Sequence, residues 1–350
     1  MWRVTIRDIA AETQLSTTAV SLVLNDQPNS IPEPTRRRIR ETARRLDYVP
    51  NQVARALVTQ EINAIGLLLP NISNVFFACL AKSVEQEARH YGYQTLLCDL
   101  DGSPENQRSC LQMLCQSNVK SVILASAQSQ SQCEALFSAI ESYGLTAVFA
   151  DQQIDDLRFD SVSVDNRAGA RLAVEHLLGL GHRRIGYILG PRDYADSRQR
   201  LEGVLDACRA YGTVPDEALM AGGGYSFEGG VAAGETLIAR GATAIFAFND
   251  MMAYGVWEAA KTAGRRIPEE LSVVGFDDLF FSRCMPEPLT TVYQPVEEIG
   301  RRAVQVMMST LRGQRPVHEQ IILEPKLIVR SSTAAYRAPE PSGAAPAGRN

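Results

Sequence analysis

Long apolar runs are missing from this 350-residue sequence. No segment approaches the roughly 20 apolar residues that a membrane-spanning helix requires, and residues 1–8 lack the apolar core of a secretory signal peptide. With 45% hydrophobic and 21% charged residues, the composition is that of a folded globular protein. A chain of this length holds about two or three domains. We therefore expect a cytoplasmic protein that does not associate with membranes.

The seven cysteines and four histidines show none of the patterns of a disulfide framework or a zinc site. The cysteines are odd in number, and none belongs to a Cys-x-x-Cys pair or to a Cys/His cluster with metal-ligand spacing. Reduced thiols and no bound metal are the expectation.

Motifs that carry common enzyme chemistry are absent as well. Gly222-Gly223-Gly224 and Gly179-Leu180-Gly181 do not form the Gly-x-Gly-x-x-Gly turn of dinucleotide-binding enzymes, and there is no phosphate-binding Lys-Ser/Thr motif. His176 and His182 lie around a helix end, where capping or packing is commoner than catalysis. Because no nucleophile, base and orienting group can be assembled, we expect neither enzymatic activity nor a cofactor.

Positive charge is concentrated at the amino-terminal end. Residues 1–60 hold 9 Arg and 6 Asp or Glu, a net charge of +3, so the rest of the chain carries −8 and the total is −5. A small basic domain on an acidic body fits an anionic partner that is confined to one end.

Two short helices joined by a tight turn are predicted near the amino terminus. Apolar residues recur at helical spacing on both sides of a break at Gln14-Leu15-Ser16: Ile6, Ile9 and Ala10 before it, and Val20, Val23 and Leu24 after it. Ser16 is a suitable N-cap for the second helix, whose outward face carries Thr17, Thr18, Ser21 and Leu22. In a helix-turn-helix this face enters the major groove of DNA. The alternative is a small helical bundle of another kind.

Two further helical segments follow. The first, residues 34–46, turns Ile39, Ala43 and Leu46 inward and places Arg36, Arg37, Arg40 and Arg44 along one side, which indicates either phosphate contacts or a solvated face. In the second, Asn51 is a plausible N-cap after Pro50, and Val53, Ala54 and Leu57 recur at helical spacing. A helix of two turns is marginal alone in water, so this segment is either a conditional helix or an ordinary linker.

From residue 64 onward, short apolar runs alternate with longer amphipathic stretches. The runs are Ala64 to Leu69, Thr95 to Cys98, Ser121 to Ala125, Ala147 to Ala150, Ser161 to Val164, Ile185 to Leu189, Ala244 to Phe248 and Leu271 to Gly275. Continuous apolar strands separated by helices indicate parallel sheets that are covered on both faces. The two series predict two α/β lobes, each a doubly wound parallel sheet, with ligands beyond the carboxyl ends of the strands.

Polar and aromatic residues follow these strands and are the candidates for a ligand site. They are Asn74, Phe76, Phe77, Asp151, Asp165, Arg198, Arg200, Asn249, Asp250, Asp277 and Asp278. Aromatic plates next to Arg, Asp and Asn are typical of sugar recognition, because flat rings cover C–H surfaces while paired donors and acceptors bind hydroxyls. Each residue taken alone could equally cap a strand or helix end.

The amino-terminal motifs resemble those of the LacI/GalR family of bacterial transcription regulators. They are Val4-Thr5-Ile6-Arg7-Asp8-Ile9-Ala10, Leu15-Ser16-Thr17-Thr18-Ala19-Val20-Ser21-Leu22-Val23-Leu24-Asn25, Thr35-Arg36-Arg37-Arg38-Ile39 and Leu46-Asp47-Tyr48-Val49-Pro50-Asn51. The resemblance implies that Thr17, Thr18 and Leu22 read bases, and that the hinge helices of a dimer insert Leu57 into the minor groove of a pseudo-palindromic operator. Ala19 and Leu22 depart from the residues usual in the family, Thr and Arg or His. The full set of predicted DNA contacts is Thr5, Ser16, Thr17, Thr18, Ser21, Leu22, Asn25, Asn51, Val53, Ala54, Arg55 and Leu57.

The same resemblance implies a sensor similar to periplasmic sugar-binding proteins. Asn74-Val75-Phe76-Phe77 is similar to their Asn-Pro-Phe-Phe loop, and the residues at matching effector-contact positions are Asp151, Asp196, Arg200, Tyr225, Asn249, Asp277 and Gln294. Gln152 stands where ribose-type binders often carry Arg, and Asp196 stands where some relatives place a hydroxyl. This pattern favours a pentose-like monosaccharide over a purine as the effector.

We therefore predict a helix-turn-helix domain over residues 1–48, a hinge helix or linker over 49–61, a two-lobed effector domain over 62–333 and a disordered tail over 334–350. Lobe 1 is expected to comprise 62–160 and 294–323, and lobe 2 to comprise 161–291 and 324–333. No leucine heptads follow, so the resemblance implies a homodimer rather than a coiled-coil tetramer. The predicted function is a DNA-binding repressor controlled by a small sugar-like effector. A purine, nucleoside or phosphorylated-sugar effector, and a sugar-binding protein without DNA binding, remain the alternatives.

Overall fold

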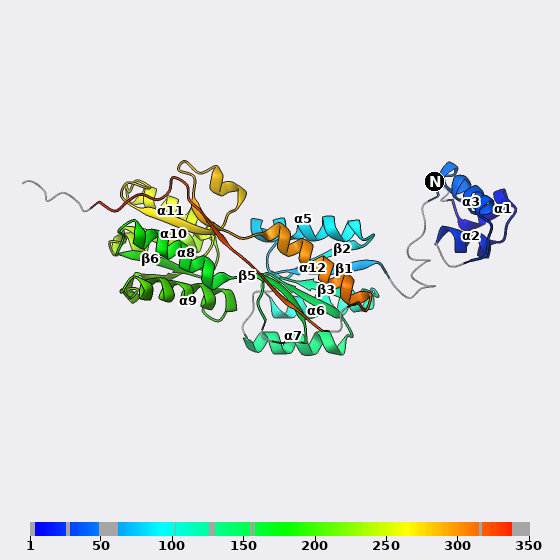
Figure 1. Ribbon diagram of the computed structural model, residues 1–350, viewed down its shortest axis with the longest axis horizontal. Coiled ribbons are helices and arrows are strands. Elements are labelled where there is room, and N and C mark those ends of the chain that lie inside the picture. Colours follow the sequence, from blue (N-terminus) through cyan, green and yellow to red (C-terminus); the bar gives the residue numbers. More distant parts are fainter. Residues whose placement is uncertain are drawn as a thin grey trace, which may run out of the picture. The chain divides into compact units, whose positions relative to one another are not determined.

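The computed structural model describes residues 4–25, 29–48, 62–101, 103–125, 130–154, 156, 158–314 and 317–337. The chain divides into two compact units, Met1–Ile62 and Asn63–Asn350 (Figure 1). The predicted hinge segment 49–61, with Asn51, Val53, Ala54, Arg55 and Leu57, lies outside the described residues. Within the described part of the chain, no helix has the length and apolar character needed to cross a membrane.

The first unit contains three helices, α1 (Ile6–Thr13), α2 (Thr17–Leu24) and α3 (Glu33–Arg45). Their shared core consists of Ile9, Ala10, Val20, Val23, Ile39 and Ala43, the inward positions that helical spacing predicts. Each of the first two helices begins at a side-chain cap. Thr5 and Asp8 form a capping box at α1, and Ser16 Oγ accepts a 3.1 Å hydrogen bond from the backbone N–H of Ala19 at α2. The helix-turn-helix prediction is therefore confirmed.

Lobe 1 of the second unit is built on a six-stranded, all-parallel sheet. The strand order is β11-β5-β4-β3-β1-β2, with β1 (Ala64–Leu69), β2 (Gln94–Asp99), β3 (Ser121–Leu124), β4 (Thr146–Ala150), β5 (Asp160–Val164) and β11 (Gln320–Leu323). Helices α5 (Val75–His90) and α12 (Val296–Leu311) pack together on one face, and α6 (Pro104–Gln116) and α7 (Gln130–Ser142) cover the other (Figure 1).

Lobe 2 repeats this arrangement with the strand order β12-β10-β9-β8-β6-β7. The strands are β6 (Ile185–Leu189), β7 (Met220–Gly222), β8 (Ala244–Ala247), β9 (Ser272–Asp277), β10 (Thr290–Tyr293) and β12 (Lys326–Ile328). All pairs are parallel except β10 with β12. Helix α8 (Asn166–Gly179) packs on α9 (Ala195–Ala210), and α10 (Phe227–Ala239) packs on α11 (Asp250–Thr262). The 3₁₀ turns η1 (Glu217–Leu219) and η2 (Phe280–Arg283) complete the lobe.

Two predicted boundaries are wrong. Strand β5, expected to open lobe 2, pairs with β4 and β11 in the sheet of lobe 1, so the chain first crosses between the lobes after Val164. The second wrong boundary is the start of the expected disordered tail at residue 334. The imidazole of His182 is hydrogen-bonded to the carbonyl of Ala334 at 3.0 Å, and the backbone N–H of Tyr336 donates to the carbonyl of Leu180 at 2.8 Å. Residues 334–337 are thus part of lobe 2, and 338–350 lie outside the described residues.

Helices α8 and α9 approach each other closely at Gly203. A Cβ atom at this position would overlap the backbone carbonyl of Arg167 and would lie 2.9 Å from the Cβ of Ala170. The absence of a side chain therefore sets the spacing of the pair, and α9 carries several of the site candidates described below.

We expect Gly203→Ala to force α8 and α9 apart and to lower the free energy of unfolding by about 1–3 kcal/mol, as overpacking of a well-packed interior does. Thermal denaturation of the full chain measures this change. Gly222→Ala is the matched control, because a Cβ there meets no described atom within 4 Å. Equal melting temperatures for the two variants would contradict the close-packing argument.

Candidate functional site

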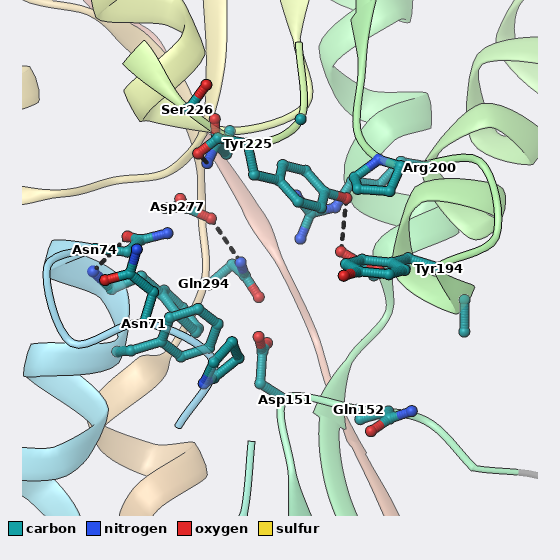
Figure 2. A pocket seen from close by; sticks show the side chains of 18 of the residues that line it. Asn71, Asn74, Asp151, Gln152, Tyr194, Arg200, Tyr225, Ser226, Asp277 and Gln294 are labelled. Carbon is teal, nitrogen blue, oxygen red and sulfur yellow. Dashed lines mark hydrogen bonds between the residues drawn. The ribbon is translucent and has the colours of Figure 1, made fainter. Parts of the chain in front are cut away.

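A cavity of about 330 Å³ lies between the lobes, at the carboxyl ends of their strands. Figure 2 shows its lining side chains converging from both sheets. Among the predicted effector residues, those that line it are Asn74, Phe76, Phe77, Asp151, Asp196, Arg200, Tyr225, Asn249, Asp277 and Gln294. Its volume is near the lower end of the usual range for ligand sites, about 300–1,000 Å³, which indicates a small ligand.

Four predicted candidates are not in the lining: Asp165, Arg198, Asp250 and Asp278. The carboxylate of Asp278 pairs with Arg330 at 2.6 Å. Asp165 lies at the first crossover between the lobes, where its carboxylate caps α8 by accepting a 2.8 Å hydrogen bond from the N–H of Ala168. Arg198 is exposed and donates to the backbone carbonyl of Asp193 at 2.7 Å. It lies two residues before Arg200 on α9, and positions two apart on a helix face different directions. Asp165 and Arg198 both have local structural roles.

Sequence reasoning missed several lining residues. They are Pro70, Asn71, Asp101, Gln152, Gln153, Pro191, Tyr194, Ala195, Gly224 and Ser226. Asn71 and Pro191 each lie two residues after the end of a strand, so the rule that found Asn74 could have found them. Tyr194 precedes α9 at its N-cap, and no sequence signal separates it from an ordinary loop aromatic.

Arg200 is held by interactions from several elements of lobe 2. It is 3% exposed. Its Nε donates to the amide oxygen of Asn166 at 2.8 Å, and its Nη1 donates to the carbonyl of Phe248. The guanidinium carbon also lies 3.8 Å from the ring centroid of Phe276, a cation–π distance. These contacts fix the group and leave further N–H donors for a ligand.

The charge of Arg200 is stabilised by its neighbours. Burial favours the neutral guanidine, but Tyr225 and the carboxyl groups of Asp196, Asp277 and Asp151 outweigh it, so the pKa of Arg200 lies above its ordinary value. A permanent positive charge therefore stands at the centre of an acidic wall.

Tyr225 forms the side of the cavity next to α9. Its hydroxyl donates a 2.6 Å hydrogen bond to Asp196 (Figure 2). The ring lies so close to Gly190 that a Cβ there would overlap it, and the backbone of Tyr225 has a φ of 60°. Such a backbone is strained for a bulky residue and is often found where function requires it.

Asp277 and Gln294 form a second fixed pair. The amide nitrogen of Gln294 donates to the Asp277 carboxylate at 2.7 Å (Figure 2), and Gln294 is 1% exposed. Behind them, Asp250 is fully buried and accepts hydrogen bonds from the N–H of Leu279 and from other groups of lobe 2. Asp250, a predicted site candidate, is therefore a structural residue of lobe 2 and not part of the cavity lining.

The carboxyl groups of the cavity hold protons more tightly than usual. Burial raises the pKa of Asp151 to about 8, although the charge of Arg200 opposes it. Burial and the charge of Asp250 raise the pKa of Asp277, against the effects of Arg200 and Gln294. Strongly perturbed carboxyl groups in a cleft are typical of functional sites.

The two asparagines at the cavity also have capping roles. The side-chain oxygen of Asn249 accepts from the N–H of Met252 at 2.9 Å, and that of Asn74 accepts from the N–H of Phe76 at 3.0 Å. The capping alternative therefore holds for both residues without removing them from the lining. Phe76 and Phe77 are packed edge to face, with their centroids 5.4 Å apart.

The predicted DNA-reading face lies on α2 and at the helix caps. Thr5, Ser16, Thr17 and Thr18 are exposed, whereas Ser21, Leu22 and Asn25 are partly buried. The Asn25 amide donates to the backbone carbonyl and hydroxyl of Ser21 at 2.9 and 3.1 Å. Asn25 therefore caps the carboxyl end of α2. Thr17 and Thr18 lie exposed at the amino end of the same helix, away from this cap.

Several arginines of α3 hold the first unit together. Arg38 donates to the carbonyl of Thr13 at 3.0 Å, Arg45 pairs with Glu12, and Arg36 donates to the carbonyl of Ile31 at 2.8 Å. Arg37 pairs with Glu41 at 2.8 Å. These arginines therefore have structural roles within the first unit.

Comparisons with known proteins agree with both units. The family model of bacterial regulatory proteins of the lacI family matches residues 5–51, and that of a periplasmic binding protein-like domain matches residues 174–333. The HTH-type transcriptional regulator DegA of Bacillus subtilis (strain 168) is 34% identical over 333 residues, which are 95% of this chain and 98% of DegA.

Solved structures of LacI-type regulators also superpose on most of this chain. The lac repressor dimer bound to operator and the anti-inducer ONPF superposes with a TM-score of 0.85 at 26% identity, over 95% of this chain and 100% of that one. A LacI family transcriptional regulator from Enterococcus faecium with bound ribose superposes with a TM-score of 0.72 at 27% identity, over 78% of this chain and 100% of that one.

The raised pKa of Asp151 makes stability depend on pH. Between the ordinary carboxyl pKa and about 8, the folded state keeps a proton that the unfolded state releases, so the stabilisation present at low pH is lost as the pH rises through this window. We expect Asp151→Asn, which needs no proton, to melt several degrees above the parent protein at pH above about 8, with an advantage that shrinks toward low pH.

Thermal denaturation of both unliganded proteins across this pH range tests the expectation. Asp193→Asn, which removes an exposed carboxylate from the turn before α9, is the charge-matched control. An advantage of Asp151→Asn that is the same at every pH would mean that the folded protein holds no proton there.

Proposed function

Because the chain belongs to the LacI family of bacterial regulatory proteins, we propose that it is a dimeric transcriptional repressor whose affinity for operator DNA is set by a small, polyhydroxylated, sugar-like effector between its two lobes. The observation that carries this proposal is the cluster of Arg200, Asp151 and Asp277, which faces the cavity together with the aromatic pair Phe76 and Phe77.

The side chains of the cavity suit hydroxyl groups. Arg200 offers N–H donors, and the carboxylates of Asp151 and Asp277 offer acceptors, so vicinal hydroxyls can donate to one side and accept from the other. Phe76 and Phe77 supply apolar rings for the C–H face of a sugar. Ribose bound to the Enterococcus faecium regulator supports a monosaccharide of pentose type here as well.

A phosphorylated effector fits less well. Arg200 is the sole Lys or Arg among the described lining residues, whereas the lining contains four aspartates, Asp101, Asp151, Asp196 and Asp277. A phosphate would approach more carboxylates than cations, and like charges that share a buried site repel each other strongly. We therefore place free sugars before sugar phosphates among the candidate effectors.

The two lobes provide a means of control. The chain crosses between the sheets after Val164, after Tyr293, and between Leu323 and Lys326. An effector that touches both lobes favours the closed arrangement by the difference between its affinities for the open and closed states. In this proposal, closure changes the order of the hinge segment 49–61 and hence the affinity of the helix-turn-helix units for DNA.

The helix-turn-helix unit argues for DNA binding over a simple sugar-carrying role. Thr17 and Thr18 present hydroxyls at the exposed beginning of α2, where short polar side chains reach base edges or phosphates. Leu22 would offer an apolar contact, such as a thymine methyl group. Thr5, Ser16, Ser21 and Asn25 complete the proposed contacts of this unit.

The first test is a thermal-shift screen of the purified full-length protein against monosaccharides, sugar phosphates, nucleosides and purines. A ligand that binds the native state alone raises the melting temperature. Hits among sugar-like compounds that also change operator affinity support the proposal. Hits confined to purines, nucleosides or phosphorylated sugars would keep the regulator and overturn the proposed effector class.

We expect Arg200→Ala to abolish the effector response while the dimer remains folded, because its guanidinium is the fixed donor of the cavity. Asp277→Ala should do the same by removing the acceptor opposite it. Operator-binding titrations with and without the effector measure the response. Arg198→Ala is the matched control, since this exposed arginine is on the same helix and outside the cavity lining. An unchanged response in Arg200→Ala would remove that residue from the site.

We expect Leu57→Ala to weaken operator binding by about tenfold, equivalent to about 1.4 kcal/mol, and to reduce DNA bending, because an apolar wedge in the minor groove is lost. Gel-shift titration and a bending assay on the same operator measure the two effects. Effector affinity should remain as in the parent protein. Equal operator affinity in parent and variant would exclude the wedge.

A further inference from the structure

We propose that the effector carries a protonated amino group, so that it is an amino sugar or an amino polyol rather than a neutral sugar. This inference rests on the proposed function, because it concerns the same cavity between the lobes. It is drawn from the charges of the lining, from one unpartnered side-chain atom, and from the hydrogen-bonding capacity of an ammonium group.

The described lining is rich in carboxyl groups and poor in cations. Four aspartates face a single arginine, and that arginine already donates to Asn166 and Phe248. The hydrogen-bond partner of Asp196 is the neutral hydroxyl of Tyr225, and that of Asp277 is the neutral amide of Gln294. Burial raises the pKa of Asp151 to about 8 and also raises the pKa of Asp277, so protons compensate part of this acidity in the unliganded protein. A bound cation would take the place of those protons, whereas a neutral ligand would not.

The side chain of Gln294 indicates that the cavity wall lacks a hydrogen-bond donor. Its nitrogen donates to Asp277 at 2.7 Å, and this orientation turns its oxygen the other way. That oxygen is buried and has no hydrogen-bond partner among the residues that the structure describes. Figure 2 shows it pointing toward the carboxylate of Asp151 across the cavity. Once Asp151 has lost its proton, two acceptors face each other and the described lining supplies no donor between them.

An ammonium group satisfies such a wall better than a hydroxyl does. It offers three N–H donors and no acceptor, so it can serve several acceptors at once and carries the compensating charge. A hydroxyl offers one donor and brings acceptor lone pairs of its own. The remaining hydroxyls of the ligand would face Arg200 and the asparagines, and its C–H surface would face Phe76 and Phe77.

A metal ion does not fit this role equally well. Among the described residues, no three His, Cys, Asp or Glu side chains converge as metal ligands do. The carboxylates are distributed over different walls of the cavity, and an organic cation with several hydroxyls can contact all of them.

Isothermal titration calorimetry on the full-length protein tests the inference with matched compounds. The amines are D-glucosamine, D-galactosamine, D-mannosamine and 1-amino-1-deoxy-D-glucitol, each compared with its hydroxyl analogue and its N-acetyl derivative. The expected result is that at least one amine binds tenfold or more tightly than both of its neutral partners. Magnesium and calcium chloride are included as cation controls and should not compete.

Each outcome decides between the two proposals. If a neutral sugar binds as tightly as its amine, the ammonium inference is overturned and the sugar-like effector stands. If an N-acetyl derivative binds tightest, the inference is overturned in the same way. If neither amines nor neutral sugars bind and a nucleoside or sugar phosphate does, both proposals are overturned.

A second measurement uses variants and pH. At a pH above about 8, where Asp151 is ionised in the parent protein, Asp151→Asn keeps the shape of the side chain and removes its charge, so amine affinity should fall about tenfold or more. Affinity for the neutral analogue should fall by a clearly smaller factor, because Asp151 is also a proposed acceptor for a hydroxyl group. Asp193→Asn removes a charge outside the cavity and should leave the amine preference unchanged.

Amine affinity should also rise with pH as Asp151, which faces Arg200, Asp196 and Asp277, loses its proton near pH 8. 1-Amino-1-deoxy-D-glucitol is the probe for the pH series, because alkyl amines of the lysine type stay protonated up to about pH 10. A pH-independent affinity would contradict the proposal.

Discussion

The buried guanidinium of Arg200 is the interaction on which the cavity depends. A charge that has lost its water requires partners on every side, and here they come from α8, from the ends of β8 and β9, and from the turn that carries Tyr225. The same contacts hold the carboxyl ends of the neighbouring strands β8 and β9 and the amino end of α8 around one group. Asp151, Asp196 and Asp277 lie close enough to stabilise its charge, so the acidity of the cavity and the charge of Arg200 depend on each other.

Much of this arrangement follows from simple sequence rules. Buried parallel strands read as continuous apolar runs, so β1 and β6 have the predicted bounds, and residues that follow such strands gather at one edge of each sheet. Rules of this kind locate a residue along the chain but not the direction of its side chain. Arg198 and Asp165 satisfied the rule and nevertheless point elsewhere, because one faces solvent from α9 and the other caps α8.

Other features depend on contacts between distant parts of the chain. Strand β5 belongs to lobe 1 because it pairs with β11, about 160 residues later, and no local pattern contains that pairing. Strands β7 and β10 are short and carry Gly or Thr, so their apolar signal is weak. The amide orientation of Gln294 is decided by Asp277, and the unpartnered oxygen could not have been found without coordinates. In the first unit, the count of arginines overstates the charge that DNA can meet, since Arg38 and Arg45 bind within the unit.

Gln294 belongs both to the cavity and to a connection between the two lobes. This residue lines the cavity and also stands between β10 of lobe 2 and α12 of lobe 1, next to Pro295. A ligand that contacts its side chain therefore acts directly on one of the three connections between the lobes. A substitution of Gln294 therefore changes the cavity lining and this connection between the lobes together, whereas Tyr194 lines the cavity without belonging to such a connection. At Gln294, ligand recognition and the connection between the lobes cannot be altered independently.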